Sequence, residues 1–117
     1  MLEKVERMAW LMDFYGPLLT ERQKRIMQLY YDNDWSLGEI AENYEVSRQA
    51  IYDVLRRAEK ALEQYESRLG LVEKFKLNRR RLNMACELLK EIKNERNEDR
   101  LEQIRDILEQ VLENEGS

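Results

Sequence analysis

The chain has 117 residues and a formal net charge of −4, with 43% hydrophobic and 38% charged residues. Four Gly and one Pro are too few for an all-β protein, so the composition favours a single all-α domain with a helical extension. With no His and a single Cys, the chain has no imidazole base or ligand and no internal disulfide, and we expect no enzyme, metal or cofactor.

The first two helices are indicated by their ends as well as by their apolar residues. Apolar residues at helical spacing predict a helix over residues 5–15, which the Gly-Pro pair at 16–17 interrupts. Thr20 then fits an N-cap, and Gln23 three residues later completes a capping box. The second helix is expected to run to about Tyr31 and to bury a stripe made of Ile26, Met27, Leu29 and Tyr30.

Residues 36–58 carry the pattern of a helix-turn-helix. Ser36 fits an N-cap with Glu39 as its capping-box partner, and Ser47 fits the N-cap of a longer helix three residues beyond the short one. Glu45 occupies the turn, where a left-handed non-glycine residue would cost on the order of 1 kcal/mol. The inward positions would hold Leu37, Ile40, Ala41, Tyr44, Val46, Ile51, Val54, Leu55, Ala58, Leu62 and Tyr65.

The outward face of the longer helix carries candidate contacts to nucleic acid. If Ile51 is central to the buried face, the rotation of about 100° per residue turns a row of polar residues outward. Arg and Gln side chains can make bidentate contacts to guanine and adenine in a major groove. Asp53 lies among them and would repel phosphates unless it accepted from a cytosine amino group. We predict base contacts from Arg48, Gln49, Tyr52 and Arg56, and phosphate contacts from Arg57 and Lys60.

The residues up to about Phe75 resemble known protein families. Residues 19–62 resemble region 4 of bacterial sigma factors, a domain that docks on promoter DNA. The wider pattern is similar to the YlxM family of small bacterial proteins, through MDFYGPLLTERQ (12–23), LYYDNDWSLGEIAE (29–42), VSRQAIYD (46–53) and YESRLGL (65–71). The resemblance implies an all-α sigma-region-4-like fold and a DNA-binding regulator. It also implies a link to the signal recognition particle pathway, which is inferred for that family from gene neighbourhood.

Beyond Gly70 the pattern predicts a hairpin of two long helices. Apolar residues step by four and three along a seam, and a further helix starts near Asn97 and runs to near Leu112. A polar residue on such a seam often fixes partner number, so Asn78 favours a homodimer; the alternative is an Asn bonded to nearby backbone. We therefore place a helix-turn-helix domain at 1–68 and a helical hairpin at 69–117. The seam residues would be Leu71, Phe75, Asn78, Leu82, Ala85, Leu89 and Ile92, then Leu101, Ile104, Leu108 and Val111.

The net charge conceals a basic middle. Residues 1–46 carry a net charge of −4 and residues 87–117 one of −5, whereas residues 69–86 carry +4. Within KFKLNRRR (74–81), we expect Lys76, Arg79 and Arg80 to point away from the seam and to hold phosphates of DNA or RNA. The alternative is a solvated face whose charges pair with the acidic residues of 87–115.

Taken together, these features predict a non-enzymatic DNA-binding homodimer. The rival function is an accessory protein that binds the RNA or protein of the signal recognition particle. A third alternative is that the helix-turn-helix is only a structural corner between two helices, with no nucleic-acid ligand. The opening residues lack the apolar block of a signal peptide, and no apolar run reaches the length of a membrane span. With one Cys, these features predict a cytoplasmic protein without membrane insertion.

Overall fold

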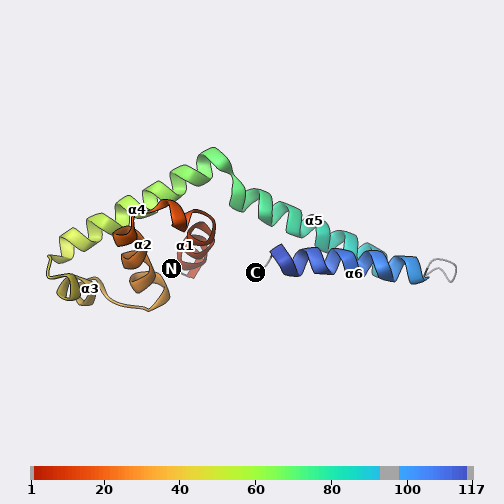
Figure 1. Ribbon diagram of the computed structural model, residues 1–117, viewed down its shortest axis with the longest axis horizontal. Coiled ribbons are helices and arrows are strands. Elements are labelled where there is room, and N and C mark those ends of the chain that lie inside the picture. Colours follow the sequence, from red (N-terminus) through yellow and green to blue (C-terminus); the bar gives the residue numbers. More distant parts are fainter. Residues whose placement is uncertain (1, 93–97, 116–117) are drawn as a thin grey trace. The chain divides into compact units, whose positions relative to one another are not determined.

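The computed structural model describes residues 2–92 and 98–115, which form helices and turns and contain no strand. The chain divides into two compact units, Met1–Val72 and Glu73–Ser117. The predicted all-α fold is confirmed (Figure 1). The elements are α1 (Leu2–Tyr15), the 3-10 turn η1 (Gly16–Leu18), α2 (Glu21–Met27), the π-helical segment η2 (Gln28–Asp32), α3 (Leu37–Tyr44), α4 (Arg48–Leu69), α5 (Leu71–Glu91) and α6 (Glu98–Glu115).

Side-chain caps start the helices of the first unit where the sequence places them. The Thr20 hydroxyl accepts from Gln23 N at 3.1 Å, and the Gln23 side chain accepts from Thr20 N at 3.1 Å. Ser36 and Glu39 form the same reciprocal pair at the start of α3. Both predicted capping boxes are therefore confirmed, and each satisfies two backbone donors that a helix start would leave unpaired. Asn97, the predicted start of the last helix, lies outside the described residues.

The core of the first unit is one cluster to which α1, α2, α3 and α4 all contribute. In α4, Ile51, Leu55, Ala58 and Leu62 are buried, which is the stripe that the sequence predicts. Trp10 and Trp35 pack partly buried against this cluster. The buried residues of the cluster are Met8, Leu11, Tyr15, Leu19, Ile26, Met27, Leu29, Ile40, Ala41, Ile51, Leu55, Ala58, Leu62 and Val72.

Two local features differ from the sequence-based expectation. The first helix starts at Leu2 rather than Val5, and Val5 is exposed because the buried face runs through Met8, Leu11 and Tyr15. The second helix widens into η2, in which Asn33 N donates to Gln28 O at 3.1 Å in the five-residue spacing of a π-helix.

Tyr15 and Glu66 form a hydrogen-bonded network at the junction of α4 and α5. The Tyr15 hydroxyl donates to Glu66 Oε1 at 2.6 Å, and the same carboxylate oxygen accepts from Val72 N at 3.0 Å. Leu71 N donates to the Tyr15 hydroxyl at 3.0 Å. Gly70 ends α4 in a left-handed conformation with φ 61°, which glycine adopts without steric cost.

In the second unit, α5 and α6 lie side by side (Figure 1), but the seam of α5 differs from the predicted one. Of the predicted seam residues, Phe75, Leu82, Ala85 and Leu89 are half-buried as expected, but Leu71, Asn78 and Ile92 are exposed. Between Phe75, Leu82 and Leu89, the side chains on the packed side of α5 are those of Arg79, which is half-buried, and Cys86, which is buried. Arg79 follows Phe75 by four residues, and Cys86 follows Leu82 by four. On α6 the packed residues are Leu101, Arg105, Leu108 and Leu112, whereas Ile104 and Val111 are exposed.

Candidate nucleic-acid interface

The turn between α3 and α4 fixes the direction in which α4 leaves the motif. Glu45 is left-handed, with φ 55°. Its N–H donates to Glu42 O at 3.2 Å, and Val46 N donates to Ala41 O at 3.0 Å, the two hydrogen bonds of a Schellman motif. Ser47 then caps α4 by accepting from Ala50 N at 3.1 Å. The turn therefore pairs its backbone groups without a glycine, at the cost in free energy that the sequence predicts for Glu45.

The exposed face of α4 brings together the six polar residues that the sequence singles out on this helix. Ile51 and Leu55 are buried on one side, and the opposite side faces solvent. Because these residues occupy consecutive turns of one rigid helix, they can meet a single extended ligand surface. The six exposed residues are Arg48, Gln49, Tyr52, Arg56, Arg57 and Lys60.

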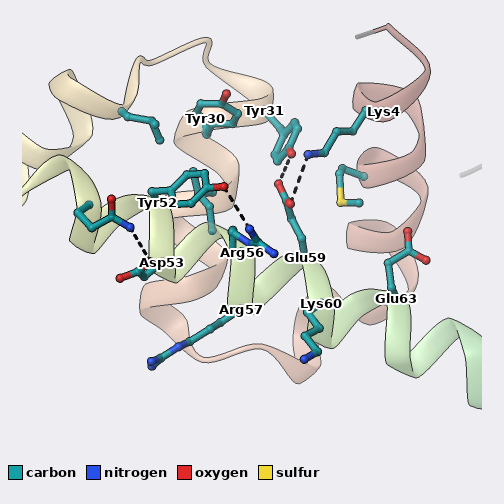
Figure 2. Close-up of a pocket in the computed structure, with 14 residues that line it drawn as sticks. Lys4, Tyr30, Tyr31, Tyr52, Asp53, Arg56, Arg57, Glu59, Lys60 and Glu63 are labelled. Carbon is teal, nitrogen blue, oxygen red and sulfur yellow. Dashed lines mark hydrogen bonds and ion pairs between the residues drawn. The ribbon is translucent and has the colours of Figure 1, made fainter.

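Two pairs of side chains on this face are organised by contacts within α4 (Figure 2). Gln49 Nε2 donates to Asp53 Oδ1 at 3.0 Å. Arg56 Nη1 donates to the Tyr52 hydroxyl at 3.3 Å, and the guanidinium lies 5.8 Å from the Tyr52 ring centroid. The hydrogen bond to Tyr52 is the main reason that the pKa of Arg56 is raised above its ordinary value. The face is thus pre-organised around Tyr52–Arg56, whereas Gln49 must leave Asp53 to make a bidentate base contact.

Arg48 lies at the tip of the motif, over the first turn of α3. A Cβ atom added to Gly38 would lie 3.0 Å from Arg48 Nε and 3.0 Å from Arg48 Nη2. Gly38 therefore leaves the space that the guanidinium occupies. This role of Gly38 cannot be predicted from the sequence, because an isolated Gly within a short helix gives no signal of the side chain that packs over it.

A groove of about 980 Å³ runs along the exposed face of α4 (Figure 2). Residues of α1, η2, α3 and α4 line it, so the face is concave on one side. Its charged lining holds the cations of Lys4, Arg56, Arg57 and Lys60 and the carboxylates of Asp53, Glu59 and Glu63.

Acidic residues in the second half of α4 are held by α1 and η2. Glu59 accepts from the Tyr31 hydroxyl and pairs with Lys4 Nζ at 3.4 Å. Burial, followed by the hydrogen bond to Glu59, raises the pKa of Tyr31, which therefore stays protonated. Glu63 accepts two hydrogen bonds from Arg7, at 3.0 Å and 2.8 Å. These carboxylates are paired within the protein, and the basic surface of α4 is centred on its first half. These pairs cannot be predicted from the sequence, because they join residues far apart in the chain.

The basic stretch 74–81 in the second unit is only partly available to a ligand. Lys74, Arg80 and Arg81 are exposed, whereas Lys76 and Arg79 are half-buried. The expectation that Arg79 points away from the hairpin is wrong: its Nη1 donates to Leu112 O at 3.3 Å, near the end of α6. A cation at this end of a helix satisfies a terminal carbonyl and interacts favourably with the helix dipole.

The part of the chain that the structure describes contains no group of three or more His, Cys, Asp or Glu residues placed to hold a metal ion. None of its described helices is both long and apolar enough to span a membrane.

Comparison with known proteins identifies the family. Residues 2–111 match the model of the UPF0122 family, described as "Putative helix-turn-helix protein, YlxM / p13 like". The chain is 54% identical to YlxM of Bacillus subtilis over 94 residues, covering 80% of this chain and 86% of the relative. It is 61% identical to a Geobacillus kaustophilus UPF0122 protein over 79 residues (68% and 72%), and 47% identical to a Listeria welshimeri one over 111 residues (95% and 96%). The chain therefore belongs to the UPF0122 family of YlxM/p13-like helix-turn-helix proteins.

Proposed function

We propose that this chain is a non-enzymatic, cytoplasmic regulator that binds duplex DNA as a homodimer through the exposed face of α4. The observation that carries the proposal is the set of six polar and basic side chains on that face, from Arg48 to Lys60. An α-helix of this kind fits the major groove of B-DNA, and its first residues are the ones that reach base edges in helix-turn-helix proteins.

In this proposal the residues of α4 divide by role. Arg48 and Gln49, at the tip, contact base edges, and Tyr52 and Arg56 extend this contact one turn further along the groove. Arg57 and Lys60 contribute contacts to phosphates, which add affinity without adding sequence preference. Asp53 limits the net positive charge of the face, so binding depends on the geometry of α4 as well as on charge.

The test is a titration of labelled duplex DNA of random sequence at two salt concentrations. We expect affinity to fall with salt, with a slope of about 0.9 for each phosphate contact. The double variant Arg48→Ala/Arg56→Ala removes two cations from the face and should lose at least roughly tenfold in affinity at the lower salt concentration. Arg68→Ala is the matched control, because Arg68 is exposed in the last turn of the same helix. A slope near zero, or a double variant that binds like the control, would overturn the proposal.

A second candidate function is supported by the exposed basic residues of the other unit. Lys74, Arg80 and Arg81 could hold the phosphates of an RNA in an accessory role to the signal recognition particle. In that case Arg80→Ala/Arg81→Ala would abolish co-purification with the particle, whereas Arg48→Ala/Arg56→Ala would leave it unchanged. The reverse pattern would exclude this function. Arg79 is unsuitable for the test, because its loss would also remove the hydrogen bond to α6.

A further inference from the structure

Helix α5 is apolar on two opposite faces. Its inner face packs through Phe75, Leu82, Cys86 and Leu89. Its outer face carries Leu77, Met84 and Leu88, which are 38%, 65% and 56% exposed. At about 100° per residue, these three side chains fall within an arc of about 40°, half a turn away from Cys86. A helix that is apolar on two sides is typical of one packed between two neighbours.

The exposed charges of α5 are unevenly distributed along the helix. Lys74, Arg80 and Arg81 outnumber Glu73 in its first half, and Glu87 and Glu91 outnumber Lys90 in its second half. Two such helices in antiparallel orientation bring the net basic half of each opposite the net acidic half of the other. A parallel pair would instead bring halves of like net charge together, which is unfavourable. The net charge of the two halves therefore favours the antiparallel orientation.

From this we propose that a second copy of the chain packs on the outer face of α5, with the two α5 helices antiparallel. This inference rests on the homodimer of the proposed function and names its surface. A two-fold axis between residues 82 and 83 places Leu77 opposite Leu88 of the second copy. The same register places Arg80 close to Glu87 of that copy, on the same flank of the contact.

The exposed apolar residues of α6 do not offer an equal surface. Ile104, Ile107 and Val111 are exposed on α6. At about 100° per residue, the exposed carboxylates among the described side chains of α6 lie on the other side of this helix, and Arg100 is the only described charge beside the three apolar residues. This surface therefore carries no pair of opposite charges among the described residues that would orient a second copy. The carboxylates are Glu98, Asp99, Glu102, Asp106 and Glu113.

The first test is the mass in solution, measured by analytical ultracentrifugation of the full chain over a range of concentrations. The contact is small, so we expect a concentration-dependent equilibrium that approaches twice the chain mass of 14.2 kDa. Met84→Asp/Leu88→Asp should give the monomer mass with unchanged helicity by circular dichroism, since both positions are exposed. Ile104→Asp/Ile107→Asp is the matched control on α6 and should still dimerise. A monomeric wild type, or a dimer lost in the control and kept in the α5 variant, would overturn the proposal.

A second test fixes the orientation even if the aspartate variant fails to fold. Leu77→Cys and Leu88→Cys proteins, mixed and oxidised, should cross-link to each other far more than either does to itself. Cys86 is buried, and the protein without added cysteines controls for it. Cross-linking of Leu77→Cys mainly to itself would indicate a parallel pair and overturn the proposal.

Charge reversal supplies an independent readout. Arg80→Glu alone should weaken the dimer at least roughly tenfold, and Arg80→Glu/Glu87→Arg should restore it. Glu87 lies 3.5 Å from Lys90 within its own helix, so Glu87→Arg alone is also measured. No restoration in the double reversal would overturn the register. A failure of DNA binding with an intact dimer counts against the proposed function and leaves this inference standing.

Discussion

The hydroxyl of Tyr15 donates a 2.6 Å hydrogen bond to the carboxylate of Glu66, which joins the end of α1 to the last turn of α4. Glu66 is only 8% exposed, and its oxygen also accepts from the backbone of Val72, the second residue of α5. The carboxylate therefore pays part of its desolvation cost through two hydrogen bonds. Residues of the two separate motifs MDFYG and YESRLGL therefore meet in this network.

Replacing Tyr15 by Phe tests the energetic weight of this network. Tyr15→Phe keeps the ring in the core but removes the donor to Glu66 and the acceptor of Leu71 N. We expect a loss of about 2–3 kcal/mol in the free energy of unfolding, because the hydrogen bond to a charged group is lost inside the core. Urea unfolding measures the change, with Tyr52→Phe as a control that loses only an exposed contact and less than about 0.5 kcal/mol. Equal effects of the two substitutions would contradict this account.

Alkaline pH should destabilise the protein through the buried Tyr15 and the half-buried Tyr31. Burial, followed by the hydrogen bonds to Glu66 and Glu59 respectively, raises the pKa of Tyr15 and Tyr31 above the ordinary value of 10.0. Above pH 10 the unfolded chain releases these protons while the folded chain keeps them. Their contribution to stability is therefore complete below pH 10 and is lost as the pH rises through the folded pKa.

The variant Tyr31→Phe isolates one of these groups. Its free energy of unfolding should fall less steeply than that of the wild type between pH 10 and pH 11, by up to about 1.4 kcal/mol per pH unit. Urea unfolding at several pH values measures the two slopes. Because the variant also loses its hydrogen bond to Glu59, the slopes and not the absolute values are compared. Parallel curves would show that Tyr31 does not hold its proton in the folded state.

Much of the first unit could be predicted because its signals are local. A capping box needs only two residues three positions apart, and burial of Ile51 places the whole exposed face of α4 by rotation. The π-helical widening at η2 could not be predicted in this way, because it is a change of hydrogen-bond spacing within a helical segment that the apolar pattern does not mark. The same holds for Gly38, whose role depends on the direction taken by Arg48.

The second unit illustrates a register ambiguity. Phe75, Leu82 and Leu89 repeat every seven residues, and a heptad seam can be completed either three or four residues after each of them. The first choice consists of Asn78 and Ala85, and the second of Arg79 and Cys86. Each choice contains one polar or charged residue, so the apolar pattern does not decide between them. The structure follows the second choice: Cys86 is buried, and Arg79 is half-buried with its guanidinium donating to Leu112 O, whereas Asn78 is exposed and Ala85 is half-buried.

Glycine in the turn of the helix-turn-helix should stabilise the protein. Glu45 is left-handed at φ 55°, and glycine removes the steric cost of that conformation. We expect Glu45→Gly to raise the free energy of unfolding by about 1 kcal/mol. Glu42→Gly, at an exposed position within α3, should lower it by about the same amount. Thermal unfolding of both variants measures the difference, and a loss of stability in Glu45→Gly would mean that its side chain contributes more than its backbone costs.

Asp53 is the residue whose substitution best separates charge from base recognition on α4. In the structure Gln49 Nε2 donates to Asp53 Oδ1 at 3.0 Å, and the asparagine of Asp53→Asn keeps an oxygen that can accept this hydrogen bond. The substitution removes one negative charge beside Arg56 and Arg57. Because the carboxylate is already engaged with Gln49, we expect its main effect on DNA to be repulsion of phosphates.

Affinity for duplex DNA of random sequence should therefore rise roughly three- to tenfold at low salt in Asp53→Asn, and the gain should shrink as salt screens the charge. Glu6→Gln makes the same change of charge at an exposed position of α1 and should have a smaller effect. Labelled-duplex titrations at two salt concentrations measure both variants. If Asp53 instead accepted from a cytosine amino group, Asp53→Asn would lose affinity for the preferred sequence selectively, because an amide recognises that base less well than a carboxylate does.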